Sequence, residues 1–533
     1  MSNVTKPIIL DETGQAIKAA IKEGATIVAD KIKGGSKRSG LVYGFHINAD
    51  ESDPSAAVTY LNDAVGMTPA RMNFLSNKFS YGSWADAFFM PRPCMLKYDG
   101  TVDYYLDPND YEKKENGEVS ALGDSTMEYG VKYPGNAMME WGRNNQQIWT
   151  KCLPDGDDVN SGSVFISNQK IDESYTAWPF INNQGVLTTH FYTAIYNGSI
   201  TAYTSDGTKY RLRSIPRRPV MNSPGNNSYD IPWDDDTADP VTNLGSTLTQ
   251  AGHEVRLALN NNPGVDLAFS DTYPTFNGDS PTVARSSIYW FTEVFCDIQL
   301  INNLLVLIGK TLNTQDAFGN GNMNGNGASG YLNNGVLYTG SNEYIPGDPS
   351  TPNYATLNKS GLFWGSSSNK QAVKTFGMEN WWGNQYRRYA GHISKNSTNV
   401  TPNDYTHWIK NTFGQDDGSS TIGYNSNGTG YVDSLCVIPT SNSYIKKSKF
   451  IDSVTYGGNT YRIATFLASD GGGSASTYYS DYFYQNRSSQ PYYMRGGRSN
   501  DGYRSGAFYI VLGFNISYAG WYVGAALSYK PVS

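Results

Sequence analysis

The pattern of apolar and polar positions in the first forty residues predicts a helix. Asp11 and Thr13 are candidate N-caps, and Gly34-Gly35-Ser36 would end the helix near Lys33. We therefore expect residues 1–39 to form an N-terminal helical segment that serves attachment or trimerisation.

The apolar stripe of this helix begins like the seam of a coiled coil. Its small or apolar positions step by four, three and four residues, at Ile17, Ile21, Gly24 and Val28. A strict heptad would next need an apolar residue at position 31, whereas the chain has Ile32, which also fits an ordinary amphipathic helix. Two heptads are too short to be stable alone. The stripe could pack on its own chain or on copies of itself in a trimer, and the candidate oligomerisation residues are Ile17, Ile21, Val28 and Ile32.

From residue 40 to residue 218 the pattern changes to short runs of period two. These runs are separated by Gly, Asn, Asp and Pro, and they read GLVYGFHI, AAVTYL, MLKYDG, VDYYLD, VFISNQ and HFYTAIYNG. Such alternation predicts a β-sandwich or meander. The proline-containing stretch RLRSIPRRPVMNSPGNN turns the chain out of this β-rich module. Residues 219–284 then form a connecting region.

The C-terminal part, residues 285–533, combines one long helical pattern with strand-like pieces. Residues 286–309 repeat apolar side chains at i, i+3 and i+4, which predicts a helix with one broad apolar face that ends at Gly309. The pieces VLYTG, GLFWGSS, YIVLGF and WYVGAALSYK follow. The expected fold class is mainly β, with an α+β C-terminal domain.

Composition favours a binding protein over a helical enzyme. The 533 residues are 39% hydrophobic, 14% aromatic and only 17% charged, and they include 40 Tyr. A chain of this kind is made soluble by Asn, Ser, Thr, Gly and tyrosine hydroxyls, as many extracellular β-rich proteins are. The net charge of -7 argues against a nucleic-acid partner, which would need clustered Lys and Arg.

Candidate catalytic and metal-binding motifs are few. Cys94, Cys152, Cys296 and Cys436 form no CxxC pair, so buried free thiols are expected. The GxGxxG match at residues 325–330 lies in an Asn/Gly-rich loop without the flanking strand and helix of a dinucleotide site. The acidic stretches 155–158 and 233–236 could hold Ca²⁺ or simply be solvated. Spacing alone leaves a paired-carboxylate glycosidase open, without positive support.

Targeting signals are not evident in the sequence. The first residues, MSNVTKPIILDETG, lack the basic and then apolar pattern of a secretory signal, and the longest apolar stretch is too short to cross a bilayer. We therefore expect synthesis in a cytoplasm and no membrane insertion. A chain made in a cytoplasm but composed like an extracellular protein is consistent with a virion component.

The stretch GMENWWGNQYRR at residues 377–388 resembles the G-x-E-N-h-W-G-N motif of the C-type lectin fold of the formylglycine-generating-enzyme type. LLVLIGKTLNTQDAFGNG at 304–321 and the segments 417–432 and 495–529 are similar to other parts of that fold. The residues at 495–497 (Arg-Gly-Gly), 506–508 (Gly-Ala-Phe) and 524–525 (Gly-Ala) match its framework. The motif residues are Gly377, Glu379, Asn380, Trp382, Gly383 and Asn384.

The overall pattern is similar to phage fibre proteins and to the variable proteins of diversity-generating retroelements. The segments PRPCMLKYDGTVDYYLDPNDY and HFYTAIYNGSI resemble the module that precedes such lectin-like domains in phage fibres. The resemblance covers roughly residues 40 to 533 and is strongest after residue 285. It implies a C-type lectin-like ligand-binding domain at 285–533, a buried Trp382, and loop backbone groups satisfied by Glu379 and Asn380.

The resemblance does not imply the enzyme's reaction or a metal-bridged sugar site. The enzyme of this fold acts through cysteines near its C-terminus. Here only Cys436 lies in about the last 230 residues, and no cysteine falls in the terminal motif. The Glu-Pro-Asn and Gln-Pro-Asp tripeptides of Ca²⁺-dependent lectins are also absent. We therefore expect no enzymatic activity, no cofactor and no metal.

The terminal stretch carries the side chains that are typical of paratopes. Tyr, Trp and Arg supply rigid contact area, and Ser, Asn and Gly supply adaptable hydrogen bonds. Phe508, Ile510 and Leu512 alternate and are expected in the core. The candidate ligand-binding residues are Arg498, Ser499, Asn500, Asp501, Tyr503, Arg504, Phe514, Asn515, Ser517, Tyr518, Trp521 and Tyr522.

Together these observations predict a bacteriophage virion fibre or adhesion protein. It is expected to be a homotrimer that attaches to other virion proteins through its N-terminus and recognises a glycan or protein receptor on the host cell surface. The alternative is a structural head- or tail-decorating protein whose lectin-like domain docks onto another virion component.

Overall fold

The structure is a computed structural model that describes residues 5–10, 16–20, 40–97, 100–124, 135–182, 185–202, 210–216, 220, 290–324, 336–337, 339–342, 355–397, 404–410, 431–486, 492–513 and 522–531. The chain divides into two compact units, Met1–Leu41 and Val42–Ser533. Among the described residues strands predominate over helices, which confirms the prediction of a mainly β protein.

The first unit contains a β-hairpin where the sequence predicted a helix. Strand β1 (Thr5–Leu10) pairs antiparallel with β2 (Ala16–Ala20), and Ile9 lies opposite Ile17. The helix prediction is therefore wrong over Ala16–Ala20. Two short apolar runs joined by five residues that include Gly14 form a hairpin pattern, which the helical spacing obscured. Ile17 belongs to β2, whereas Ile21, Val28 and Ile32 lie outside the described residues.

The second unit contains a seven-stranded antiparallel sheet. It combines strands from three distant parts of the chain, so the segments predicted as separate domains, 40–218 and 285–533, share one sheet. In order across the sheet the strands are β16 (Trp290–Thr292), β28 (Leu527–Tyr529), β13 (Phe191–Ala194), β10 (Gly135–Trp141), β7 (Arg92–Lys97), β8 (Val102–Asp107) and β9 (Asp110–Lys114).

The second unit also contains a four-stranded antiparallel sheet and three short hairpins. The four strands are β11 (Trp149–Asp155), β12 (Asp158–Ser167), β3 (Val42–Ile47) and β4 (Val58–Asn62). The hairpins pair β5 (Arg71–Asn73) with β6 (Lys78–Ser80), β14 (Ser199–Ala202) with β15 (Tyr210–Arg213), and β17 (Lys374–Thr375) with β18 (Met378–Glu379).

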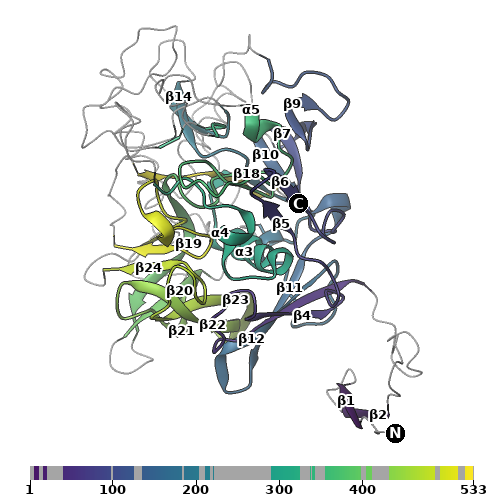
Figure 1. Ribbon diagram of the computed structural model, residues 1–533, viewed down its shortest axis with the longest axis vertical. Coiled ribbons are helices and arrows are strands. Elements are labelled where there is room, and N and C mark those ends of the chain that lie inside the picture. The colour runs from purple at the N-terminus through teal and green to yellow at the C-terminus, as the bar shows by residue number, and fades with distance from the viewer. Residues whose placement is uncertain are drawn as a thin grey trace. The chain divides into compact units, whose positions relative to one another are not determined.

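The largest sheet is built only from residues after 385, and Figure 1 shows it in green and yellow on the side opposite β7 and β9. Its path is β21 (Tyr431–Val437), β20 (Tyr405–Lys410), β19 (Tyr386–Asn396), β25 (Tyr492–Arg495), β26 (Ile510–Leu512), β24 (Tyr482–Gln485), β22 (Ser443–Tyr456) and β23 (Asn459–Gly471). The short strand β27 (Val523–Gly524) pairs parallel with β19.

Helix α3 (Phe295–Gly309) lies in the middle of this unit (Figure 1). The sequence predicted a helix from Ser286, but residues 290–292 form β16, because this aromatic and β-branched run pairs with β28. Every residue of α3 except Gln299 is buried, so the helix is surrounded by protein and does not expose one polar face. It ends at Gly309 as expected, and Lys310 takes the left-handed conformation that follows.

Among the described residues, two short helices and three 3-10 turns lie in the loops. They are α4 (Thr314–Phe318), α5 (Ala355–Asn358), η2 (Arg143–Asn145), η3 (Trp178–Phe180) and η7 (Gly502–Arg504). All four cysteines are buried free thiols, as the sequence predicted. Within the described residues, no helix is long and apolar enough to span a membrane.

Candidate ligand-binding surface

The two tryptophans of the GMENWWGN stretch are buried and hydrogen-bonded. Trp382 is 0% exposed, and its indole N–H donates to the carbonyls of Gly319 and Asn320, each at 3.1 Å. The indole N–H of Trp381 donates to Oδ1 of Asn302 on α3 at 2.9 Å. Burial of Trp382, predicted from the sequence, is confirmed. Each indole places a large apolar ring in the core while its one donor is satisfied.

The end of the same stretch holds an irregular loop by side-chain hydrogen bonds. Oδ1 of Asn384 accepts from the backbone N–H of Leu337 at 2.7 Å and from the amide of Asn322 at 2.9 Å. Gly383 has a φ of 77°, and a Cβ there would lie 2.7 Å from the carbonyl oxygen of Asn322. This position therefore requires glycine both for its conformation and for the close approach of the neighbouring loop.

The predictions for Glu379 and Asn380 have different outcomes. Glu379 is buried and accepts from the backbone N–H groups of Asn197, at 2.7 Å, and Gly340, at 2.5 Å, which confirms its predicted role. Burial raises the pKa of Glu379 to about 8, although both backbone donors act in the opposite direction. The side-chain amide of Asn380 has no hydrogen-bond partner among the described residues, so its predicted role is wrong. Its backbone carbonyl instead accepts from Arg387 at 3.0 Å.

A buried ion pair connects this core to the terminal segment. Arg495 donates to both carboxylate oxygens of Glu293, at 2.7 and 3.1 Å, and Arg387 lies 3.1 Å from the same carboxylate. The guanidinium of Arg495 also lies 3.7 Å from the ring centroid of Trp381 and donates to its carbonyl. Burial, together with the charge of Arg495, lowers the pKa of Arg387 to about 9. Two cations thus share one anion and an aromatic face.

The loop after Arg495 is fixed to this core by backbone hydrogen bonds. The carbonyl of Gly496 accepts from Gly383 N at 2.7 Å, and Ser499 N donates to the carbonyl of Asn384 at 3.1 Å. Gly502 N donates to the carbonyl of Met323 at 2.8 Å. Asn302 completes the connection, because its amide donates to the carbonyl of Ala507 while its oxygen accepts from Trp381. Residues 496–507 therefore follow a path set by buried groups.

On the outside of this loop, Arg498 lies against two tyrosines. Its guanidinium is 4.3 Å from the ring centroid of Tyr522 and 5.4 Å from that of Tyr386. Asp501 orients it, because Nε of Arg498 donates to the Asp501 carboxylate at 3.0 Å. Tyr386 and Tyr522 meet edge to face at 5.9 Å. Each group is held by its neighbours before any ligand arrives.

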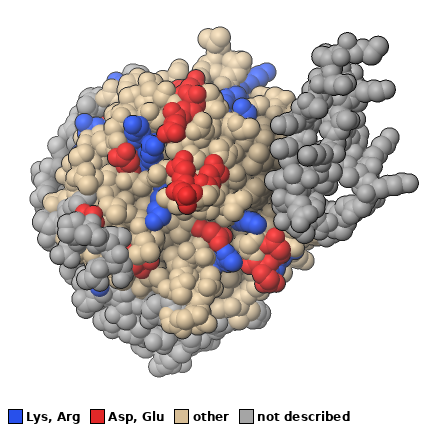
Figure 2. All heavy atoms as spheres, turned by 90° about the horizontal axis from the view of Figure 1, so that it is seen from below, with Lys and Arg blue, Asp and Glu red and all other residues tan. Residues whose placement is uncertain are grey.

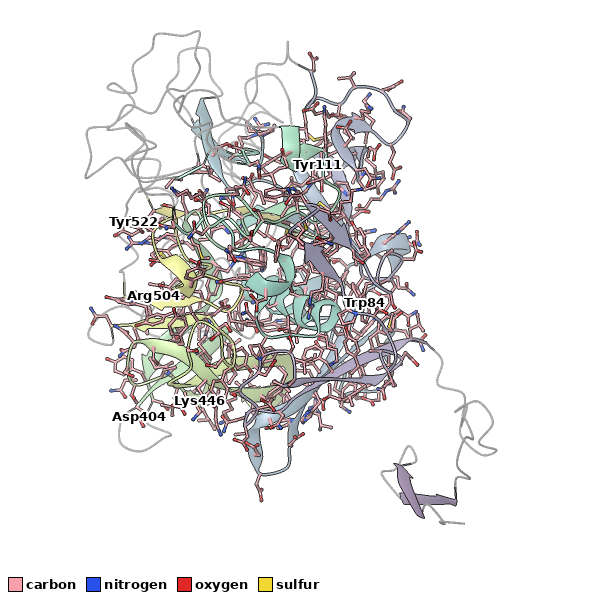
Figure 3. The ribbon with its side chains drawn as sticks, viewed as in Figure 1. Trp84, Tyr111, Asp404, Lys446, Arg504 and Tyr522 are labelled. Carbon is pink, nitrogen blue, oxygen red and sulfur yellow. The ribbon has the colours of Figure 1, made fainter. Side chains whose placement is uncertain are left out.

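A second cation–aromatic contact lies further along the same segment. The guanidinium of Arg504 is 4.7 Å from the ring centroid of Tyr482, and Tyr444 packs edge to face on Tyr482 at 5.2 Å. Tyr503, next to Arg504, is 54% exposed. Figure 3 shows Arg504 and Tyr522 on the same side of the unit, both from the C-terminal segment. We call the set Tyr444, Tyr482, Arg498, Tyr503, Arg504 and Tyr522 the tyrosine–arginine surface.

The structure places the candidate ligand-binding residues in three groups. Arg498, Asn500, Asp501, Tyr503, Arg504 and Tyr522 are exposed or half-buried. Ser499 is fully buried and is not part of the exposed surface, because its backbone N–H is hydrogen-bonded to Asn384 of the buried motif. The other five lie outside the described residues: Phe514, Asn515, Ser517, Tyr518 and Trp521.

Three tyrosines of this region were not among the candidate site residues: Tyr386, Tyr444 and Tyr482. Tyr386 and Tyr444 are separated from the terminal segment by more than fifty residues and reach it only through sheet pairing. The signal available in the sequence was the frequency of Tyr alone, which does not distinguish surface from core. Among the expected core residues, Leu512 is buried, whereas Phe508 and Ile510 are half-buried.

In the part of the chain that the structure describes, no group of three or more His, Cys, Asp or Glu residues could hold a metal ion. The acidic loop at 155–158 is among these residues, and Asp155 pairs with His46; residues 233–236 lie outside them. Burial raises the pKa of the Cys436 thiol to about 12, which keeps it protonated at neutral pH.

Comparison of the sequence with protein-family models gives no match, and comparison with curated proteins gives none either.

Proposed function

We propose that the chain is a bacteriophage fibre or adhesion protein that recognises the bacterial surface through the tyrosine–arginine surface. The observation that carries this proposal is the combination of fixed backbone and accessible aromatic and cationic side chains at residues 498–504. Tyr and Arg side chains dominate binding energy at protein interfaces because they bring large contact area at a low entropic cost.

Pre-organisation strengthens this proposal. Arg498 is oriented by Asp501 and two tyrosine rings, so a ligand that contacts it does not have to immobilise a free side chain. The resemblance of residues 377–384 and 495–529 to a lectin-like fold adds the expectation that this loop region faces a ligand. Several copies of the chain on one particle would turn weak contacts into strong attachment.

The experiment is a cell-binding assay with the fluorescently labelled full chain on a panel of intact bacterial cells. The double variant Tyr503→Ala/Arg504→Ala removes two exposed side chains and is expected to lower binding to the recognised cells by at least about tenfold. The matched control is Leu75→Ala, because Leu75 is fully exposed and belongs to the turn between β5 and β6. Equal binding by both variants, or no binding to any cell, would contradict the proposal.

The structural alternative is distinguished by imaging. Electron microscopy of the particle, with an antibody fragment against residues 498–504, is expected to find this segment on the outside. A segment that is inaccessible in the intact particle but accessible in the isolated chain would instead favour docking onto another virion component.

A further inference from the structure

A polar pocket of about 400 Å³ lies on the seven-stranded sheet, away from the residues proposed for host recognition. Its lining comes from β7, β8, β10, the turn η2, the residue that follows β9 and the residue that precedes β13. The lining residues are Arg92, Tyr105, Glu115, Glu140, Arg143, Asn144, Asn145 and His190. All of them carry hydrogen-bonding groups, so the pocket suits a hydrophilic ligand.

Glu140 lies at the base of the pocket and is 4% exposed. Its carboxylate accepts from the hydroxyl of Tyr192 at 2.9 Å and from that of Tyr105 at 3.1 and 3.2 Å. No lysine or arginine forms an ion pair with Glu140 among the described residues. A carboxylate has about four acceptor positions, and these two hydroxyls leave part of that capacity for a donor from a ligand.

His190 lies beside Glu140 at a distance that leaves room between them. Its Nε2 is 4.0 Å from Oε1 of Glu140, which is too long for a hydrogen bond. The other ring nitrogen, Nδ1, is 2.8 Å from the hydroxyl of Thr189, which fixes the orientation of the ring. One oxygen atom of a ligand could lie within hydrogen-bonding distance of both Glu140 and His190.

Another wall is the turn η2, which packs against the segment before β13 that carries His190. Gly142 has a φ of 101°, and a Cβ there would lie 2.2 Å from the carbonyl oxygen of Thr189. Asn144 and Asn145 both have a φ of 59°. Within the described residues Arg143 has no ion-pair partner. The turn thus presents two amides and one cation to the pocket, and the residue before it has to be glycine.

Charge distinguishes the classes of ligand that the pocket could hold. Arg92 is neutralised directly by Glu115, with Nε and Oε1 2.9 Å apart, and its guanidinium covers the ring of Tyr105 at 3.3 Å. Arg143 and Glu140 then offset one another. Because the formal charges of the lining cancel, a strongly anionic or cationic ligand gains little, whereas a neutral ligand with many donors and acceptors can use every group.

We propose that this pocket binds a neutral saccharide unit. The vicinal hydroxyls of a sugar both donate and accept hydrogen bonds. They can therefore bind to a carboxylate, an imidazole, two amides and a guanidinium that line one pocket. The volume falls within the range of small-ligand pockets. Since the aromatic ring of the pocket is covered by Arg92, the ligand gains no stacking contact, and binding of a single unit is weak. The proposal does not depend on the tyrosine–arginine surface.

The test is saturation-transfer NMR of the full chain with methyl glycosides of glucose, galactose, mannose, rhamnose and N-acetylglucosamine. At least one glycoside is expected to show transfer, and Arg143→Ala is expected to weaken its binding by about tenfold. Arg143 is exposed and without an ion-pair partner among the described residues, so its removal should leave the fold intact. Glu140→Gln, which exchanges one acceptor oxygen for an amide, should weaken binding as well.

The control variant is Tyr503→Ala, which alters the tyrosine–arginine surface and should leave glycoside binding unchanged. No transfer to any glycoside would overturn the proposal. Binding that is lost in Tyr503→Ala but kept in Arg143→Ala would also overturn it, because the sugar would then occupy the other surface. Free glycine serves as a zwitterionic probe, and transfer to glycine without transfer to any glycoside would show that the pocket takes a different class of ligand.

Discussion

Arg495 and Glu293 lie 202 residues apart in the sequence and form a buried two-point ion pair, with distances of 2.7 and 3.1 Å. Arg495 precedes the loop of the tyrosine–arginine surface, and Glu293 precedes α3. The pair therefore connects the start of the loop at residues 496–507, called here the recognition loop, to the segment that leads into α3. Because Arg387 approaches the same carboxylate, removal of this one anion takes the ion-pair partner from two buried cations.

Glu293→Gln is expected to lower the free energy of unfolding by about 3–5 kcal/mol, the range for a buried pair that loses one partner. Chemical denaturation of the full chain measures this change. The control is Glu118→Gln, since Glu118 pairs with Lys114 at the surface, where such a change costs about 0–1 kcal/mol. If both variants had the same stability as the wild type, the buried pair would have no structural role.

Trp382→Ala is expected to destabilise the chain by about 3–5 kcal/mol, because it empties a fully buried aromatic site and leaves the carbonyls of Gly319 and Asn320 without their donor. Thermal unfolding followed by tryptophan fluorescence measures the effect. Tyr503→Ala serves as the exposed comparison and should change stability by less than about 0.5 kcal/mol. A Trp382→Ala chain with wild-type stability but lost cell binding would show that Trp382 belongs to the binding site.

Two glycines of the recognition loop distinguish the energetic cost of a left-handed backbone from the cost of a steric clash. Gly497 and Gly502 both have positive φ, 80° and 63°. A Cβ at Gly497 would lie 2.1 Å from Oγ of Ser505, whereas a Cβ at Gly502 meets nothing within 4 Å. Both changes to Ala pay about 1–2 kcal/mol for the left-handed conformation, but only Gly497→Ala adds a clash. Gly497→Ala should therefore be the less stable of the two by denaturant unfolding, and equal values would contradict this placement of Ser505.

Acid sensitivity is expected from the buried pair His392 and His407. Nε2 of His407 is 2.8 Å from the carbonyl of Ala468 and therefore donates, while its Nδ1 lies 2.9 Å from His392 and 3.0 Å from the hydroxyl of Tyr493. Burial lowers the pKa of His407 to about 4 and that of His392 well below its ordinary value. Both rings are neutral in this arrangement.

The unfolded chain binds a proton on His407 near pH 6.5, but the folded chain binds it only near pH 4. Stability from this group is therefore complete above about pH 6.5 and is lost as pH falls toward 4, by about 3 kcal/mol. His407→Gln should lose less stability than the wild type between pH 7 and pH 4, as measured by denaturation at each pH. His46→Gln, at the surface, is the control. Parallel pH profiles for His407→Gln and the wild type would refute this account.

The sequence predicted those features that depend on neighbouring residues. The mainly β fold, the buried Trp382, the backbone hydrogen bonds of Glu379 and the end of α3 at Gly309 all follow from local patterns or from one short motif. The start of α3 could not be placed in this way. Residues 290–292 have helical spacing, but their pairing with β28 supplies hydrogen bonds that outweigh it.

Features that depend on distant parts of the chain were not accessible from the sequence. Tyr386 joins the recognition region because β19 pairs with β27 and β25, and no local pattern indicates this. The shared seven-stranded sheet could not be foreseen for the same reason, since its partners are separated by hundreds of residues. Asn380 shows the opposite error, because a motif match suggested a side-chain role that the local hydrogen bonding does not support.

Figure 2 shows the described Lys and Arg side chains interspersed with Asp and Glu on the face it presents. On that face, charges of one sign do not gather into a continuous patch among the described residues. Long-range electrostatic attraction therefore contributes little to association there, and specificity has to come from short-range contacts.

Strand β28 lies between β13 and β16 inside the seven-stranded sheet, so the residues that complete the sheet are translated more than three hundred codons after β13. Until β28 has been translated, the edge of β13 that pairs with β28 has no partner strand. The nascent chain therefore exposes this edge during most of its synthesis. A premature stop codon shortly before residue 527 would leave the sheet divided, and the truncated product would expose two unpaired edges to degradation or aggregation.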